Sequence, residues 1–212
     1  MIVLAGTIGA GKSSLAKALG EHLGTEVYYE AVDNNPVLDL YYQDPKKYAF
    51  LLQIYFLNKR FESIKMAYTQ ENNILDRSRF EDELFLTLNY KNGNVTKTEL
   101  EIYQNLLNNM LEEIDGMPKK RPDLLVYIDV SFETMLSRIT QRGRSFEQID
   151  EQPGLKTYYQ QVHHEYPSWY DAYDMSPKIR VNGDVLDFVN NEKDLEEVLR
   201  QVDQELIKLE LK

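Results

Sequence analysis

Hydrophobic positions along the chain follow two patterns: short continuous apolar runs, and longer stretches with helical spacing. Residues 2–5 (IVLA) form the first short run and end at Gly6, which is typical of a strand buried on both faces. The next stretch places apolar residues such as Leu15 and Leu19 on one face of a helix. The same alternation predicts strands over 2–5, 26–32, 73–76, 122–130 and 177–184, and helices over 12–23, 48–71, 80–90, 97–114, 131–143, 155–172 and 191–209. Strands that alternate with helices in this way predict an α/β fold with a mainly parallel sheet of five strands flanked by helices.

Two segments interrupt this alternation. Residues 33–45 are rich in turn formers and carry Pro36 and Pro45 as breaks. Residues 142–155 are charged and contain two glycines and a proline, so we expect this segment to be mobile. No linker, repeat or low-complexity stretch divides the chain, which predicts one domain over residues 1–212.

Composition and charge narrow the class of protein. The chain has 212 residues, of which 42% are hydrophobic, and a formal net charge of −11. This acidic balance disfavours binding to a nucleic acid polymer, because phosphates repel an acidic surface. The absence of cysteine excludes disulfides and cysteine–zinc sites, and no apolar run approaches the roughly 20 residues of a membrane span. The first residues form a strand-like run, not a signal peptide, so we expect a cytoplasmic location.

The loop after the first predicted strand matches a nucleotide-binding motif in full. The pattern G-x-x-x-x-G-K-[ST] lies between a strand and a helix, which is the context that such a loop needs. Its backbone N–H groups converge on phosphate oxygens, Lys12 neutralises the β- and γ-phosphates, and Ser13 coordinates Mg²⁺. A ligand-free glycine-rich turn is the plain alternative. The residues predicted to bind ATP here are Gly6, Thr7, Ile8, Gly9, Ala10, Gly11, Lys12, Ser13 and Ser14.

A GTPase switch uses the same loop but is not favoured. Such proteins usually carry D-x-x-G and N-K-x-D segments. In this chain Asp76 is followed by Arg-Ser-Arg, and residues 58–61 (NKRF) have no aspartate in the fourth position.

Acidic residues lie at the carboxyl ends of two predicted strands, the edge of an open α/β sheet that faces the ligand. Glu30 is placed to accept a proton from an attacking hydroxyl during phosphoryl transfer, although a solvated loop glutamate is the plain alternative. Asp76 follows the third strand, where an acid can bind Mg²⁺ through water. The neighbouring Arg77 can contact the substrate oxygen or a phosphoryl oxygen. With the phosphate loop, these residues predict a phosphotransferase.

Three arginines gather near the end of the helix predicted over 131–143. Arg138 and Arg142 lie four residues apart on one helical face, and Arg144 follows directly. Their charges repel one another unless an anion lies between them, and a lid over residues 139–154 that clamps triphosphate oxygens supplies that anion and excludes water. A solvated basic helix end is the alternative.

The order and spacing of the phosphate loop, YYE, DRS and RGRSFEQ resemble the deoxyribonucleoside kinase family over nearly the whole chain. The segment EAVDNNPVLDLYYQDPKKYAFLLQIYFLNKR is most similar to the short bacterial deoxyadenosine and deoxyguanosine kinases. The resemblance implies a P-loop NTPase-like three-layer fold. It also implies transfer of the ATP γ-phosphoryl group to the 5′-hydroxyl of a purine deoxynucleoside, with Mg²⁺.

The resemblance also implies roles for individual residues. Glu30 becomes the general base and Arg77 assists it, while Asp76 stands where the family often has glutamate. Tyr42 and Glu147 hold the sugar 3′-hydroxyl. Gln53 pairs with the base edge, since an amide offers both a donor and an acceptor. The substrate-binding set is then Glu30, Tyr42, Gln53, Arg60, Arg77, Asp82 and Glu147, in which Arg60 and Asp82 form a second base-reading pair.

Other interpretations of the acceptor side stay open. Gln53 and Tyr42 also suit ordinary packing, and Phe56, Phe80 and Phe85 are either core residues or stacking partners of the base. A thymidylate-type nucleoside monophosphate kinase shares the loop and the lid, but usually has an acid within the phosphate loop. A non-catalytic ATP-binding subunit is a more distant alternative. The resemblance further implies a dimer, with itself or with a related subunit, through the helices of 48–71 and 97–114.

Overall fold

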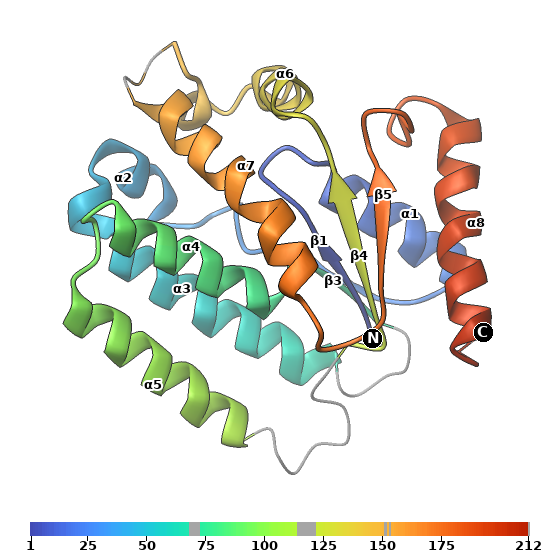
Figure 1. The fold of residues 1–212 in the computed structure, drawn as a ribbon, viewed down its shortest axis with the longest axis horizontal. Helices are drawn as coiled ribbons and strands as arrows, with labels where there is room; N and C mark the ends of the chain where they lie inside the picture. The colour runs from blue at the N-terminus through green and yellow to red at the C-terminus, as the bar shows by residue number, and fades with distance from the viewer. Residues whose placement is uncertain (68–72, 114–121, 151, 153, 212) are drawn as a thin grey trace.

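The central sheet has five strands, all parallel (Figure 1). The computed structural model describes residues 1–67, 73–113, 122–150, 152 and 154–211. The strands are β1 (Ile2–Ala5), β2 (Val27–Tyr28), β3 (Ile74–Asp76), β4 (Leu124–Asp129) and β5 (Lys178–Asn182), in the spatial order β2-β3-β1-β4-β5. This arrangement confirms the predicted α/β fold, and it places the ends of β1 and β3 side by side.

Helices cover both faces of this sheet. In chain order they are α1 (Lys12–Leu23), α2 (Leu38–Gln43), α3 (Pro45–Ala67), α4 (Arg79–Lys91), α5 (Lys97–Glu113), α6 (Phe132–Arg142), the short 3₁₀ helix η2 (Ser145–Glu147), α7 (Leu155–Ala172) and α8 (Glu192–Lys208). Residues at two helix ends satisfy backbone groups: Gly24 ends α1 in the left-handed region at φ 65°, and Ser131 Oγ accepts from Thr134 N at the start of α6.

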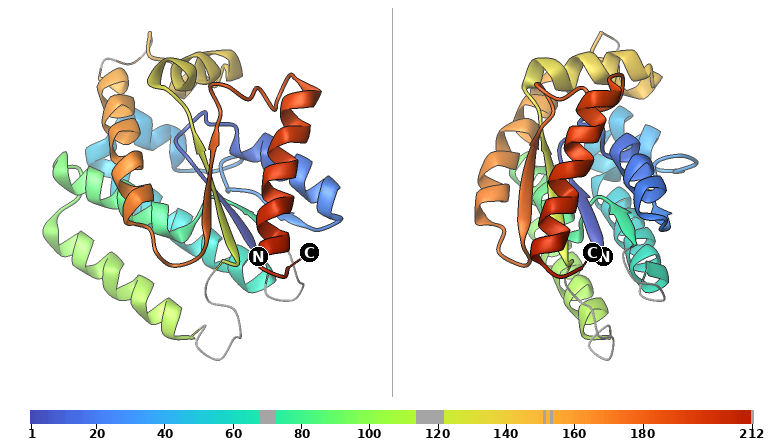
Figure 2. Two further views of the ribbon diagram at one scale, coloured as in Figure 1. Left: turned by 45° about the vertical axis from the view of Figure 1, so that its right-hand side comes forward. Right: turned by 90° about the vertical axis from the view of Figure 1, so that its right-hand side faces the viewer.

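Alternate residues of each strand point to opposite faces of the sheet, and each face has its own apolar core. Ile2 and Leu4 of β1 pack in one core, which includes residues of α1, α6 and α8. Val3 and Ala5 pack in the other, with residues of α3, α4 and α7. Figure 2 shows the two helical layers on either side of the strands. Because both faces are covered, β1 is apolar at every position.

A third apolar cluster lies away from the sheet and joins α2, α3, α4 and α5. Its members include the fully buried Leu86 of α4 and Tyr103 of α5. This cluster holds α2 and α3 together as a wall beside the carboxyl edge of the sheet (Figure 1).

The structure corrects the sequence prediction between residues 26 and 48. The strand predicted over 26–32 pairs with β3 only at Val27 and Tyr28, because the chain then turns and Asn34 adopts φ 61°. The turn-rich segment contains the helix α2, at whose start Val37 N and Leu38 N both donate to Asn35 Oδ1. Pro45 begins α3 three residues earlier than predicted, a position where a missing N–H does no harm.

Some predicted features fall outside the described residues. They are the last four residues of the helix over 48–71, the last residue of the helix over 97–114, and two positions of the lid, 151 and 153. Within the described part of the chain, no helix is both long and apolar enough to cross a membrane.

Candidate active site

The phosphate loop runs from the end of β1 to the start of α1 and lies against β4 and α6. A Cβ on Gly6, which has φ 147°, would come within 2.7 Å of the carbonyl oxygen of Ile128. A Cβ on Gly9, at φ 75°, would come within 2.9 Å of the carbonyl oxygen of Met135. Both positions therefore require glycine, and the loop is held close to its neighbours in the shape that turns N–H groups toward phosphate.

Lys12 is buried at the base of this loop. Its Nζ donates to the carbonyl oxygens of Gly6 at 2.8 Å and Thr7 at 2.9 Å. Burial, aided by the charge of Arg77, lowers the pKa of the Lys12 ammonium to about 8. A phosphate placed beside this group favours its charged form, so Lys12 is suited to hold a nucleotide polyphosphate.

Ser13 and Asp76 meet between the loop and the end of β3, as a magnesium site requires. Ser13 Oγ donates to Asp76 Oδ2 at 2.5 Å. The other carboxylate oxygen of Asp76 is buried and has no hydrogen-bond partner among the described residues. A hydroxyl beside an incompletely satisfied carboxylate fits Mg²⁺, which usually takes one or two protein oxygens together with substrate phosphates. In the described part of the chain, no cluster of three or more His, Cys, Asp or Glu side chains is placed to hold a metal ion.

Glu30 lies just beyond β2 and faces two arginines. Its Oε1 is 2.6 Å from Arg77 Nε and 3.5 Å from Arg60 Nη2. Burial raises the pKa of the Glu30 carboxyl, but Arg77, Arg60 and Lys12 outweigh burial and lower it below the ordinary glutamate value. Glu30 is therefore a carboxylate at neutral pH, able to accept a hydrogen bond from a hydroxyl.

Arg77 adopts a backbone conformation that is uncommon for a side-chain-bearing residue, with φ 82°. Its N–H donates to the carbonyl oxygen of Leu4, which ties the end of β3 to β1. Its guanidinium lies 4.8 Å from the centre of the Phe85 ring and donates from Nη1 to Tyr166 Oη at 3.0 Å. The left-handed turn and these contacts direct Arg77 toward Glu30.

Arg60 and Asp82 form a buried bidentate pair. Arg60 Nε and Nη2 donate to the two carboxylate oxygens of Asp82 at 2.9 and 3.1 Å, and Nη1 donates to the carbonyl oxygen of Arg77 at 2.8 Å. Asp82 lines the central cavity, whereas Arg60 is not among the described residues that do so. Of this predicted base-reading pair, the structure thus presents the carboxylate to a ligand and turns the guanidinium toward the protein.

A single cavity of about 690 Å³ joins the phosphate loop to the wall formed by α2 and α3. Near that wall it is lined by Tyr42, Gln53, Phe56 and Phe85, together with Asp82 and Glu30. The predicted donor and acceptor sides therefore share one space. Phe80 is not among the described lining residues and packs instead against Tyr173, with ring centres 5.2 Å apart.

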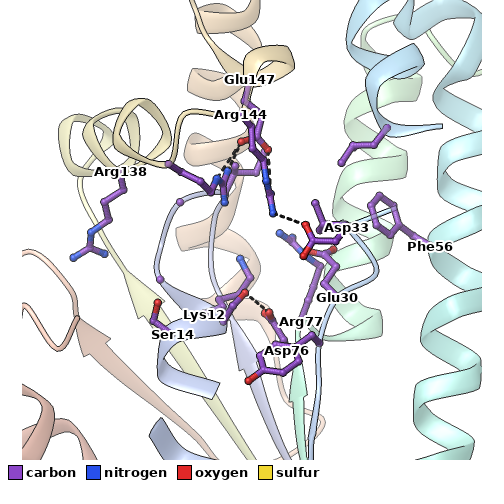
Figure 3. A pocket seen from close by; sticks show the side chains of 18 of the residues that line it. Lys12, Ser14, Glu30, Asp33, Phe56, Asp76, Arg77, Arg138, Arg144 and Glu147 are labelled. Carbon is purple, nitrogen blue, oxygen red and sulfur yellow. Dashed lines mark hydrogen bonds and ion pairs between the residues drawn. The ribbon is translucent and has the colours of Figure 1, made fainter. Parts of the chain in front are cut away.

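Two predicted lid arginines are paired with carboxylates of the protein. Arg142 Nη2 lies 2.6 Å from Glu147 Oε2, and Arg144 Nη1 lies 3.6 Å from Glu147 Oε1. Arg144 also donates to Asp33 Oδ1 at 3.3 Å, which links the lid to the loop after Glu30 (Figure 3). The anion that the arginine spacing predicts is thus supplied by side chains in this conformation, and Glu147 is shared between the lid and the acceptor side.

Arg138 differs from the other two arginines. It donates to the carbonyl oxygens of Ala10 and Gly183, both at 2.8 Å, and points away from Arg144 and Glu147 (Figure 3). It lines the cavity next to the phosphate loop while bracing that loop against the turn after β5. Its position is compatible with a phosphate contact, but its present partners are backbone groups.

The residues of the phosphate loop divide into two groups by whether they line the cavity. Ile8, Gly9, Gly11, Lys12, Ser13 and Ser14 line the cavity, whereas Gly6, Thr7 and Ala10 are not among the described lining residues. Thr7 Oγ1 donates to the sulfur of Met135 at 3.4 Å, so its side chain packs behind the loop. We expect Thr7 to contribute to nucleotide binding through its backbone alone.

Sequence reasoning missed several residues at this site. Asp33, Asp187, Val189 and Asn190 line the cavity, and Glu81 contacts the phosphate loop from α4. The pattern predicted the turn-rich segment that begins at Asp33 but assigned no structure at Asp187, and nothing in one sequence shows that these segments meet the phosphate loop. Glu81 gave a local signal, because Ser78 and Glu81 have the spacing of a capping box.

The chain as a whole is similar to known deoxynucleoside kinases. A family model described as deoxynucleoside kinase matches residues 2–208. The chain is 56% identical over 202 residues to a deoxyguanosine kinase of Lactobacillus johnsonii, covering 95% of this chain and 90% of the relative. It is 53% identical over 206 residues to a deoxyadenosine kinase of Lactobacillus acidophilus, covering 97% and 96%. The solved structure of a deoxyadenosine kinase from M. mycoides with bound dATP has a TM-score of 0.79 and 32% identity, covering 95% of this chain and 98% of that one.

Proposed function

Because this chain belongs to the deoxynucleoside kinase family, we propose that it transfers the γ-phosphoryl group of ATP to the 5′-hydroxyl of deoxyadenosine, deoxyguanosine or both. One observation supports the reaction above all others. Glu30, paired with Arg77, lines the same cavity as Lys12 and Ser13 on one side and Gln53 on the other. A carboxylate between a phosphate loop and a nucleoside-sized space is placed to act on an acceptor hydroxyl.

In the proposed step, the 5′-hydroxyl donates a hydrogen bond to Glu30. The bond from the 5′-oxygen to the γ-phosphorus forms while the bond from that phosphorus to the β–γ bridging oxygen breaks, so ADP leaves. The proton of the hydroxyl passes to Glu30. Since its pKa is lowered, Glu30 first orients the hydroxyl and takes the proton late, as the oxygen becomes acidic on bonding to phosphorus.

Charges around this step stabilise the transferred group. Lys12 neutralises charge on the phosphate oxygens, and Arg77 lies close enough to Glu30 to contact the reacting oxygens as well. Mg²⁺, which Ser13 and Asp76 would hold, supplies further neutralisation of the phosphates when bound. Arg142 and Arg144 are placed to turn from Glu147 and Asp33 toward a triphosphate and to exclude water.

Acceptor recognition rests on buried polar groups in an apolar wall. Gln53 offers an amide and Asp82 a carboxylate to the base, beside the aromatic rings of Phe56 and Phe85. Tyr42 stacks on Phe146 with ring centres 5.5 Å apart, near Glu147, and both groups are proposed to hold the 3′-hydroxyl.

We expect a panel of acceptors to identify the substrate. The four deoxynucleosides are each incubated with ATP and Mg²⁺, and monophosphate products are separated by chromatography. Deoxyadenosine or deoxyguanosine, or both, should give product at least tenfold faster than thymidine. A deoxynucleoside monophosphate panel, run in parallel, should give none.

Other results would point to the alternatives. Product from deoxythymidine monophosphate and not from nucleosides would contradict the proposal in favour of a thymidylate-type kinase. ATP binding without any acceptor phosphorylation would indicate a non-catalytic subunit.

We also propose that the chain forms a dimer through α3 and α5, and that it acts in the cytoplasm. These two helices contact each other and carry the exposed apolar side chains Leu51, Ile102 and Leu106. Replacing Leu51 and Ile102 together by glutamate should lower the mass in light scattering from twice 24.9 kDa to that of one chain. Ile207→Glu on α8, where the side chain is 59% exposed, is the matched control and should leave the mass unchanged. A parent protein that runs as a monomer would contradict this proposal.

A further inference from the structure

A buried glutamate of α4 joins the donor and acceptor halves of the site. Glu81 has no exposed surface. Its Oε1 accepts from Gly6 N at 3.1 Å and from Tyr166 Oη at 2.8 Å, and it lies 3.7 Å from Arg77 Nη1. Its Oε2 accepts from Ser78 N at 2.7 Å. Four donors from the phosphate loop, the end of β3, the start of α4 and α7 thus converge on one carboxylate.

The chemistry of these contacts requires a carboxylate. Every partner of Glu81 donates, and an ionised carboxyl group accepts with both oxygens. An amide at this position would turn its NH₂ group against another donor, either Ser78 N or the pair formed by Gly6 N and Tyr166 Oη. A capping glutamate needs only one of these contacts, so its cap alone does not account for the other three.

The contacts of Glu81 lead directly to the reacting groups. Gly6, which donates its N–H to Glu81, accepts at its carbonyl oxygen from Lys12 Nζ at 2.8 Å. Arg77, which faces Glu81 with Nη1, faces Glu30 with Nε at 2.6 Å. Gly6 therefore links Glu81 to Lys12, and Arg77 links Glu81 to Glu30.

Tyr166 closes this arrangement from α7. Its hydroxyl donates to Glu81 and accepts from Arg77 Nη1 at 3.0 Å, so Arg77 is held by two neighbours that also hold each other. The left-handed backbone of Arg77 makes such support necessary, since an uncommon conformation persists only where its surroundings fix it.

From this geometry we propose that Glu81 is a positioning residue of the phosphotransfer reaction. It holds Arg77 against Glu30, and it fixes the position of Gly6 at the start of the phosphate loop. The inference rests on the proposed kinase activity. Glu81 does not contact the reactants; it acts through Arg77 and Gly6. Its loss should therefore reduce kcat and leave the KM of the acceptor almost unchanged, because Tyr42, Gln53 and Phe56, which line the acceptor space from α2 and α3, stay in place.

The test compares Glu81→Gln with Glu99→Gln. Glu99 forms a second capping box at the start of α5, where its Oε2 accepts from Thr96 N at 2.7 Å on the protein surface. Purified variants are assayed with ATP, Mg²⁺ and the best acceptor, and kcat is expressed per folded enzyme from circular dichroism. Glu81→Gln should lower kcat by about 10–100-fold with the acceptor KM within about threefold, since small misplacements of catalytic groups have effects of this size. Glu99→Gln should keep the parent kcat.

Two further variants keep the outcome decisive. Tyr166→Phe removes the uncharged hydroxyl that donates to Glu81. This variant should fold even if Glu81→Gln does not, and it should lower kcat by about 3–10-fold. In an Arg77→Lys background, Glu81→Gln should cause less than about a threefold further loss, because residues that act through each other are not additive. A parent-level kcat for the folded variants, or fully additive losses, would overturn the inference and leave Glu81 as a helix cap. If the parent enzyme phosphorylates no nucleoside, it is the proposed function that fails.

Discussion

Glu30→Gln should retain ATP affinity and lose about 10²–10⁴-fold in kcat, the usual contribution of a general base. The amide keeps the size of the side chain but cannot accept the proton of the 5′-hydroxyl. Arg77 still has Glu81 and Tyr166 as partners, and Arg60 still has Asp82, so the fold should be maintained. Steady-state rates of monophosphate formation and calorimetric titration with ATP measure the two effects.

Glu26→Gln is the matched control for this change. Glu26 precedes β2, is exposed, and accepts from Tyr28 Oη at 2.8 Å on the surface, so the same chemical substitution should leave kcat unaffected. If Glu30→Gln turned over at the parent rate, the proton-transfer role of Glu30 would be wrong. In the parent enzyme, the contribution of Glu30 to the acid limb of kcat/KM should lie below the ordinary glutamate range, because the arginines lower the pKa of Glu30.

Lys12 should make the use of ATP sensitive to alkaline pH. In the free enzyme the pKa of Lys12 is lowered to about 8, and only the protonated form attracts phosphate. As pH rises through this value, kcat/KM for ATP should fall, approaching tenfold per pH unit. Bound ATP favours the charged ammonium, so kcat at saturating ATP should hold to higher pH than kcat/KM. Initial rates at varied ATP concentration between pH 7 and 9.5 measure both profiles.

Two substitutions test whether the fall in kcat/KM for ATP at alkaline pH comes from the loss of the Lys12 charge. Lys12→Met should lower kcat/KM by about 10²–10³-fold at every pH, as expected when a preorganised donor to developing charge is removed. Lys12→Arg keeps its charge throughout the range, so whatever activity it retains should not decline between pH 8 and 9.5. If kcat/KM of Lys12→Arg fell between pH 8 and 9.5 as steeply as that of the parent, the alkaline loss would belong to another group.

Lid arginines show where prediction from sequence reached its limit. The spacing of Arg138, Arg142 and Arg144 predicts an anion between them, and an anion is present for two of them. It is supplied by Glu147 and Asp33, whose approach depends on η2 and on the turn after β2. Arg138 instead reaches backbone carbonyls on the phosphate loop and after β5, and spacing along one helix contains no information about those partners.

Local pattern determined most of the secondary structure. The apolar run of β1 and the helical spacing of α1 and α6 depend on neighbours within a few residues, and these three elements were predicted correctly. The errors near β2 and α2 have the opposite cause. The edge strand pairs with β3 at only two residues, and α2 is stabilised by packing on α3 and the third apolar cluster, which no local window contains.

By itself the sequence determined the α/β class with a parallel sheet, the nucleotide loop, and the acids and arginine that follow the strands, because these features rest on periodicity and on motifs with short spacing. Only the tertiary structure decided how they combine. Parallel pairing of β3 beside β1 brings Asp76 to Ser13 and Arg77 toward Glu30, and it places Glu81 under Gly6, 75 residues away in the chain. Such long-range contacts follow from strand order and core packing, which depend on the whole chain at once.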